Sequence, residues 1–420
     1  MTALKTIFFA CAAAACLGAP VAAQEARFHY DGDLRLSPQS GSLSAHWIIT
    51  AHEDDLTEVS FLLSAALGEA QISGPDVVAV TSVLNEGFTG PMRAYTVTLA
   101  PSRDGADRNI TMRYAGALFA GQPQSPINSL DLNKVELTVD SFWMPFDQRF
   151  SSLVTADLDI WLPGQWDGVT MQSITRTAGG FHIDQDIAAL DLAFTLMSDA
   201  RRIEAPGYVI YDTRIPGGGN LDALVGALEH CTVYLNDLAA GAGPLPDASI
   251  IVTDRDEGGY SRGTLIALTD IAEASDASLT QFICHELSHY WSHGNAMTVE
   301  NWLNESFADY IAIIAMRDAL GEAVYDDRIA AYQRQVADVA SDLPPVWTPQ
   351  THDRPPYIVA YRKGPLALAR AEVLIGREPF ARFLQAAMQA RVSTTPQMLD
   401  VFESVAGREA RMAFEAVLAE

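Results

Sequence analysis

The sequence contains few cysteines and few basic residues for its length. Only four cysteines occur in 420 residues, too few for a scaffold that depends on disulfides in place of a core. Cys11 and Cys16 lie near the N-terminus, and the other two, Cys231 and Cys284, could be bonded to each other or buried as two thiols. Lysines and arginines number 27 against 53 aspartates and glutamates, so the formal net charge is -26. Because an acidic surface repels a phosphate backbone, we expect no nucleic-acid partner.

Long apolar runs are also absent after the N-terminus, which predicts a chain without a transmembrane span. The N-terminus has the features of a signal peptide: Lys5, an apolar stretch over residues 7–17, and small residues at 21–23 ahead of Gln24. We therefore expect residues 1–23 to be removed near Ala23/Gln24 and the protein to be exported, either periplasmic or secreted. Attachment of lipid at Cys16 is a minor alternative.

Short alternating stretches characterise the chain from about residue 24 to residue 187. Apolar and polar residues alternate over 45–50, 95–99 and 135–139, and clusters of glycine, proline and aspartate separate such stretches. A period of two, with turn residues between the runs, is typical of antiparallel strands. Residues 24–187 are therefore predicted to form an antiparallel β domain.

The second half of the chain has mainly helical patterns. A helix is predicted over 221–240, a short strand over 248–252, and further helices on both sides of a proline-rich loop at 343–356. The sequence thus predicts a fold of the α+β class. We expect it to divide into the β domain at 24–187, a second domain at 188–325 and a helical part at 326–420.

A metal-binding pattern lies on one of the predicted helices. Residues 285–289 read His-Glu-Leu-Ser-His and fit the H-E-x-x-H pattern. His285 and His289 are four residues apart, so they lie on one face of a helix and can bind a single zinc ion. Glu286, beside them, is placed to hold a water molecule at that ion. A catalytic zinc site has three protein ligands and one open position, so a third ligand must exist.

Glu305 is the predicted third ligand. It lies in Trp302-Leu303-Asn304-Glu305, at the start of a predicted helix, and fifteen residues separate it from His289. This length is enough for a loop and a turn back onto the first helix. Asp309 follows four residues later on the same face. It can accept a hydrogen bond from the far nitrogen of a ligand histidine and thereby fix the orientation of the ring.

The two metal segments resemble those of the gluzincin metallopeptidases, and specifically of the membrane alanyl aminopeptidase family. There H-E-L-x-H is followed by W-L-N-E-G-F-A, here with a shorter spacing and with Ser306 in place of the glycine. Asp309 is similar to the aspartate that follows the glutamate ligand in thermolysin. The family's Y-x-K-G tyrosine, which donates its hydroxyl to the oxyanion, is matched by Tyr361. The resemblance implies a thermolysin-like catalytic domain at 188–325, a saddle-shaped N-terminal β domain, and a helical part that carries Tyr361.

One segment departs from the family pattern. The family's exopeptidases carry G-A-M-E-N on a strand before the metal helix, where the glutamate holds the free amino group of the substrate. The matching residues here are Gly258-Gly259-Tyr260-Ser261-Arg262, of which the last four are predicted to contact the substrate. Ser261 replaces the glutamate, so specificity for a free amino terminus is in doubt unless Glu257 substitutes for it. Arg262 could bind a substrate carboxylate or form a structural salt bridge.

Together these features predict a peptidase that binds one zinc ion and acts on a peptide or protein substrate. Zinc on His285, His289 and Glu305 would activate water, Glu286 would act as general base, and Tyr361 would stabilise the oxyanion. Two alternatives stay open: a catalytically silent relative that binds peptides, and a zinc hydrolase that acts on a non-peptide bond. The sequence leaves the natural substrate and the oligomeric state undetermined.

Overall fold

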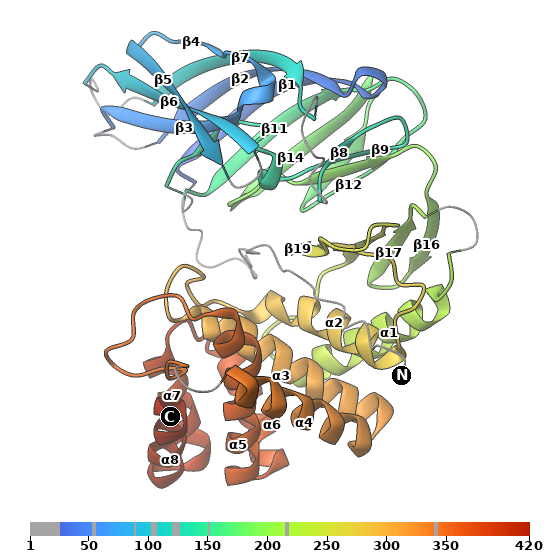
Figure 1. Ribbon diagram of the computed structural model, residues 1–420, viewed down its shortest axis with the longest axis vertical. Coiled ribbons are helices and arrows are strands. Elements are labelled where there is room, and N and C mark those ends of the chain that lie inside the picture. The colour runs from blue at the N-terminus through green and yellow to red at the C-terminus, as the bar shows by residue number, and fades with distance from the viewer. Residues whose placement is uncertain are drawn as a thin grey trace.

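The computed structural model has a β-rich domain at one end, a smaller sheet with two helices beside it, and a group of helices at the other end (Figure 1). The predicted signal peptide, residues 1–23, lies outside the described part of the chain. Within that part no helix is long and apolar enough to cross a membrane. The described residues are 26–52, 56–87, 90–101, 107–119, 127–149, 152–214, 218–339 and 343–420.

The N-terminal domain contains three β-sheets, which confirms the predicted β domain. The largest sheet has the strand order β13 (Ser173–Arg176), β14 (Gly180–Ala189), β11 (Val154–Trp161), β1 (Phe28–Ser37), β2 (Ser42–Ala51), β7 (Arg108–Ala117) and β4 (Gln71–Ser73). A second sheet has the order β10 (Phe146–Asp147), β3 (Glu58–Ser64), β6 (Gly90–Leu99) and β5 (Val77–Gly87). The third has the order β12 (Asp167–Thr170), β15 (Phe194–Met197), β9 (Lys134–Leu137) and β8 (Ser129–Leu130).

Alternation along the strands builds the core of this domain. In β1, Phe28, Tyr30 and Leu34 are buried while Asp31 and Asp33 are exposed, as expected for a strand with one face covered. Most neighbouring strands are antiparallel, but β1 and β11 are parallel, from the pair Phe28 and Val154 to the pair Arg35 and Trp161. Strand β1 therefore lies in the middle of the seven-stranded sheet, between β2 and β11.

The second domain is a five-stranded sheet covered by helices. Its strand order is β16 (Arg201–Ala205), β17 (Tyr208–Asp212), β18 (Ala248–Val252), β20 (Leu265–Leu268) and β19 (Tyr260–Arg262), so β19 is an edge strand. Helices α1 (Leu221–Leu238) and α2 (Asp276–Ser288) share one apolar core with this sheet. The predicted strand at 248–252 is β18, and the predicted helix at 221–240 is α1.

Both predicted domain boundaries fall inside regular elements. The boundary between residues 187 and 188 lies in β14, and β15 still pairs with β9 and β12 of the N-terminal domain. That domain therefore continues to Met197. The boundary between residues 325 and 326 lies within α4 (Glu322–Val339), because this helix begins directly after Gly321.

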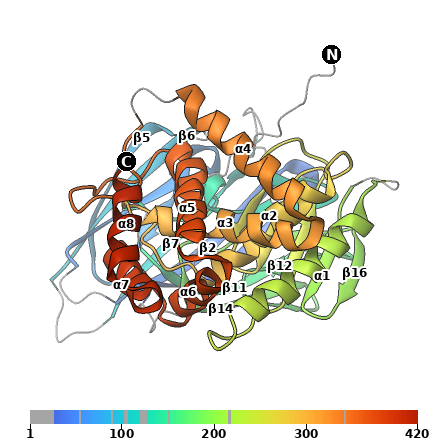
Figure 2. The same cartoon turned by 90° about the horizontal axis from the view of Figure 1, so that it is seen from below.

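The helical part surrounds one central helix. Helix α3 (Asn301–Leu320) is buried on nearly all sides of its first sixteen residues, which is why its sequence shows little amphipathic pattern. Figure 2 shows α1 to one side of α3 and the C-terminal helices to the other. These are α5 (Gly364–Ile375), α6 (Arg377–Gln389), α7 (Thr395–Ala406) and α8 (Arg408–Ala419).

The β domain is joined to the second domain by apolar and charged contacts. Arg255 donates to Glu136 at 2.7 Å, and Arg262 donates to Asp140 and Asp191 at 3.1 Å each. All of these carboxylates belong to the β domain. A buried apolar cluster spans the same junction and comprises Ile127, Val169, Ala193, Met197, Tyr211, Ile251, Tyr260, Leu265 and Ala267.

Candidate metal centre

The helix that carries the H-E-x-x-H segment is fixed at both ends. The hydroxyl of Ser275 accepts a hydrogen bond from the backbone N–H of Ser278, which caps the start of α2. After α2, a 3-10 turn over His289–Trp291 leads to Gly294, whose N–H donates to Asn304 at 2.8 Å. The amide of Asn304 donates back to the Gly294 carbonyl at 2.9 Å. This reciprocal pair holds the connection between α2 and α3, so Asn304 has a structural task in the W-L-N-E segment.

A disulfide joins α1 to α2 directly beside the metal segment. Cys231 and Cys284 are bonded, with their Cα atoms 5.1 Å apart, which settles the alternative that the sequence left open. Both cysteines are fully buried. Because Cys284 precedes His285, the cross-link attaches the metal-binding turn of α2 to the helix behind it.

The three predicted ligands converge on one buried point. The Nε2 atoms of His285 and His289 are 3.1 Å apart. Oε2 of Glu305 lies 3.7 Å from Nε2 of His285 and 3.6 Å from Nε2 of His289. In the described part of the chain, no other group of three or more histidines, cysteines, aspartates or glutamates has ligand atoms close enough to hold a metal ion.

These distances fit a tetrahedral zinc ion. Two ligand atoms at the usual zinc distance and a tetrahedral angle are about 3.3 Å apart, close to all three separations found here. Oε2 of Glu305 is buried and accepts no hydrogen bond from any described residue, so it has an unused lone pair in the centre of the group. Two imidazoles and one carboxylate are also the donor set that zinc prefers.

Asp309 lies on the far side of His285. Its Oδ1 is 3.7 Å from Nδ1 of His285 and accepts a hydrogen bond of 2.9 Å from Gln281. The same amide nitrogen of Gln281 lies 2.7 Å from the hydroxyl of Tyr332. The sequence predicted that Asp309 would face a ligand histidine, and the structure places it there. Gln281 and Tyr332 were not identified, because neither belongs to a recognisable motif.

The carboxylates make this pocket favourable for positive charge. Burial lowers the pKa of His285, but Glu305, Glu286 and Asp309 outweigh it and raise that pKa to about 9. Burial lowers the pKa of His289 to about 4, and Glu305 only partly opposes this. Burial raises the pKa of Glu305, yet the two histidines hold it below its ordinary value. Negative charge around the three ligand atoms thus favours a cation at this point.

Glu286 points to the same region from α2. Burial is the main reason why its pKa rises to about 7, and the charge of His285 and the hydroxyl of Ser261 only partly oppose this rise. A carboxyl group with such a pKa can both take and release a proton near neutral pH. Glu286, His289 and Ser261 line a small pocket together with residues that the sequence did not single out, among them Leu245, Thr264 and Tyr290.

The predicted substrate strand divides between two faces. Side chains alternate along β19, and Ser261 is directed to Glu286. Tyr260 and Arg262 are directed to the β domain, where Arg262 is buried between Asp140 and Asp191. The salt-bridge alternative for Arg262 is thus the one found, while contact of Tyr260 and Arg262 with the substrate stays a prediction.

The other two predicted positions before β19 differ from each other. Gly259 is buried and lies immediately before the strand, and Glu257 is exposed on the preceding loop. An exposed carboxylate on a loop is poorly placed to replace the missing glutamate of the family motif. Ser261 is thus the side chain of this segment that faces the metal group.

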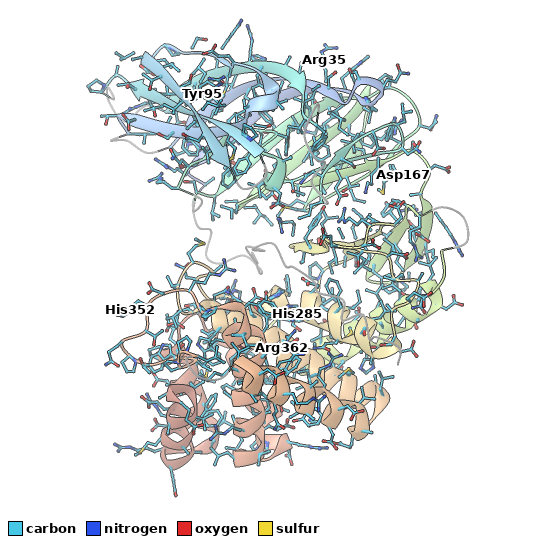
Figure 3. All side chains as sticks on the ribbon, in the orientation of Figure 1. Arg35, Tyr95, Asp167, His285, His352 and Arg362 are labelled. Carbon is cyan, nitrogen blue, oxygen red and sulfur yellow. A yellow bond between two sulfur atoms is a disulfide. The ribbon has the colours of Figure 1, made fainter. Side chains whose placement is uncertain are left out.

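Tyr361 lies against the metal group from the C-terminal part. Its ring stacks on that of His285, with centroids 5.9 Å apart, and its hydroxyl helps to lower the pKa of Glu305. It belongs to a single π-helical turn over Val359–Lys363, a feature that occurs often at functional sites. Figure 3 labels His285 and Arg362, the neighbour of Tyr361, on the side of the helices that is nearer the β domain.

Comparison with known proteins supports the same assignment. Residues 261–413 match the model of the peptidase family M1 domain. Human endoplasmic reticulum aminopeptidase 2 is 29% identical over 136 residues, which are 29% of this chain and 14% of that protein. The chain therefore spans only a small part of the length of this curated relative.

Solved structures share the fold over a longer stretch. An M1 zinc metallopeptidase from Deinococcus radiodurans matches with a TM-score of 0.63 and 17% identity, covering 94% of this chain and 95% of that chain. Leukotriene A4 hydrolase from Saccharomyces cerevisiae matches with a TM-score of 0.63 and 16% identity, covering 94% and 68%. The α+β fold predicted from the sequence is confirmed. The predicted resemblance is supported as well: residues 261–413 match the peptidase family M1 domain, and the chain shares the fold of an M1 zinc metallopeptidase.

Proposed function

We propose that this protein hydrolyses peptide bonds with one zinc ion held by His285, His289 and Glu305. The observation that carries the proposal is the convergence of these three ligand atoms within 4.8 Å of one another, with Glu286 and Tyr361 at the same buried point. When bound, zinc supplies a Lewis acid that makes water acidic enough to lose a proton near neutral pH.

Glu286 is the proposed general base. Its raised pKa of about 7 allows it to accept a proton from the attacking water and to pass it to the leaving amine. Ser261 and Glu286 line the same small pocket, and the hydroxyl of Ser261 opposes the rise of this pKa. The same carboxyl group takes the proton from water and gives it to the leaving amine. One buried acid between the zinc ligands and β19 is therefore sufficient for both proton transfers.

Tyr361 is the proposed donor to the oxyanion. The stacking of its ring on His285 holds the hydroxyl beside Glu305, at the metal group. A donor placed in advance costs no reorganisation when negative charge develops on the carbonyl oxygen. Removal of one such donor typically costs about 3 kcal/mol of transition-state stabilisation.

Strand β19 is the proposed binding site for the substrate backbone. It is the last strand of its sheet and pairs only with β20 among the described strands, so an extended peptide could add to its outer edge as a further strand. A solved relative is described as bound to a Tyr-Ser-Ala substrate, which supports a peptide as the substrate class.

We further propose that the enzyme does not require a free amino terminus. The position that faces Glu286 from β19 is Ser261, a neutral side chain that cannot pair with an ammonium group. Loss of a buried charged hydrogen bond of this kind typically costs about 2 to 5 kcal/mol. N-acetylated peptides should therefore be cleaved about as well as free ones, and simple aminoacyl-anilides should be poor substrates.

A fluorogenic peptide library, assayed with and without a chelator, tests the proposed reaction. Cleavage that disappears with chelator and returns with one equivalent of zinc is the expected result. Peptide binding without cleavage would support a silent relative instead. Hydrolysis of esters but of no peptide would support a zinc hydrolase of non-peptide bonds.

Pairs of peptides that differ only in N-acetylation test the specificity. Equal kcat/KM within each pair is expected. Strong rejection of the acetylated members would mean that another acid, such as Glu257, binds the amino group and that the enzyme is an aminopeptidase.

We also propose that the protein is exported after cleavage near Ala23/Gln24. The disulfide between Cys231 and Cys284 supports this location, because structural disulfides persist in oxidising compartments. The mass of the intact protein from its native host tests the proposal. A mass that includes Met1, or a lipid on Cys16, would contradict it.

A further inference from the structure

The backbone around Tyr361 has two carbonyl groups that each lose one possible helical donor because of Pro365. In the π-helical turn over Val359–Lys363, the N–H of Gly364 donates to the carbonyl of Val359, five residues earlier. The next residue is Pro365, which has no N–H. The carbonyls of Ala360 and Tyr361, five and four residues before Pro365, therefore lose the donors that a π-helix or an α-helix would provide.

Two side chains satisfy these carbonyls. The hydroxyl of Ser306, on α3, donates to the carbonyl of Ala360 at 2.6 Å, and both residues are buried. Nη1 of Arg362 donates to the carbonyl of Tyr361 at 2.6 Å. Tyr361, the proposed oxyanion donor, is thus held through two carbonyl groups: that of the preceding residue and its own.

The contact between Ser306 and this turn depends on Gly364. A Cβ atom at Gly364 would lie 1.9 Å from Oγ and 2.7 Å from Cβ of Ser306, so no larger residue fits opposite the serine. Ser306 is also the position at which the sequence departs from the glycine of the resembling family. A glycine there would leave the Ala360 carbonyl without this donor.

We propose that Ser306 is a positioning residue for Tyr361. By binding the carbonyl that Pro365 leaves free, it fixes the π-helical turn and holds the phenol of Tyr361 stacked on His285. Arg362 supports the same turn through the carbonyl of Tyr361. The inference rests on the proposed function in one respect, namely that Tyr361 contributes to turnover.

A double-mutant cycle on the zinc-loaded enzyme tests the catalytic consequence. Ser306→Ala and Ser306→Gly both remove the hydroxyl without adding bulk. We expect each to lower kcat per bound zinc about tenfold with little change in KM, because a misplaced donor weakens the transition state and not substrate binding. In the Tyr361→Phe background, the same substitutions should cause no further loss. Equal losses in both backgrounds would overturn the inference.

A matched control separates positioning from general stability. Thr170→Val removes a buried hydroxyl that donates to the Ala193 carbonyl at 2.7 Å in the β domain. It should change the melting temperature by a similar amount while leaving kcat unchanged. If Tyr361→Phe alone leaves kcat unchanged, the role of Tyr361 in the proposed function fails. This outcome differs from the one that overturns the inference, in which Ser306 variants lose the same activity in the wild-type and the Tyr361→Phe backgrounds.

A structural readout does not depend on activity. In a crystal structure of the Ser306→Gly variant, the turn over 359–363 should shift and the Tyr361 ring should leave its stacked position on His285. An unchanged stack at a centroid distance near the present 5.9 Å would overturn the inference.

Discussion

Removal of the disulfide between Cys231 and Cys284 should destabilise the catalytic domain without emptying the metal centre. The cross-link closes a loop with a sequence separation of 53 residues. In the chain-entropy model a loop of this length restricts the unfolded chain by about 4 kcal/mol. For a unit the size of the catalytic and helical parts together, this corresponds to a fall in melting temperature of roughly 10 °C.

Calorimetry of the Cys231→Ala/Cys284→Ala double variant measures this effect. Alanine avoids placing two hydroxyl groups at fully buried positions. Zinc content and kcat should stay close to the wild-type values, because His285, His289 and Glu305 are held by the packing of α2 on α3. Wild-type protein treated with reductant under native conditions should change slowly, since both sulfur atoms are shielded.

A double variant that melts within about 2 °C of the wild type would refute the loop-closure argument. Packing of α1 on α2 would then be sufficient to restrict both helices. Loss of zinc in the double variant would refute the independence of the metal centre from the cross-link.

Three further outcomes are expected. Glu286→Gln should retain one zinc per chain by metal analysis but lose turnover by several orders of magnitude, because an amide cannot accept a proton from water; comparable activity would place the base elsewhere. Arg262→Met leaves Asp191 buried without its partner and should lower the free energy of unfolding in urea by about 3 kcal/mol. Adding Asp191→Asn should recover part of this loss, and an unchanged urea midpoint in Arg262→Met would contradict the ion pair. Burial lowers the pKa of His293 from 6.5 to about 4, so its contribution to stability is present above pH 6.5 and is lost as the pH falls towards 4. His293→Gln should therefore lose less stability than the wild type between pH 7 and pH 5, and parallel losses would count against a neutral, half-buried His293.

The two histidine ligands could be predicted because helical geometry alone brings them together. A spacing of four residues places His285 and His289 on one face, and the same period aligns Glu305 with Asp309. No knowledge of tertiary structure is needed for these pairs. The strands with one exposed face and the long helices could be predicted for a similar reason. Apolar residues that recur at the period of a strand or a helix indicate that one face of the element is buried.

The direction of Arg262 could not be predicted in this way. A one-residue change of register in β19 exchanges the side chains that face Glu286 for those that face the β domain. The partners of Arg262, Asp191 and Asp140, are 71 and 122 residues distant in sequence. Only the packing of two domains identifies them, and no local pattern contains that information.

The π-helical turn at Tyr361 was hidden for a different reason. The sequence around Pro365 is compatible with a helix that simply begins at the proline, where a missing N–H is harmless. Whether the turn before Pro365 becomes π-helical depends on hydrogen-bond donors outside this helix. Here the donor is the hydroxyl of Ser306 on α3, which binds the carbonyl of Ala360. The disulfide is a similar case, because it required α1 and α2 to pack at the correct separation.

The central place of β1 has a consequence for the order in which the chain can fold. Its parallel partner β11 is 126 residues away in sequence, whereas its antiparallel partner β2 follows at once. During synthesis the hairpin of β1 and β2 can form early, but one edge of β1 stays without a partner until Trp161 has been made. The seven-stranded sheet is therefore completed late, and chains that end before β11 would display a long, unpaired strand edge that invites association with other chains.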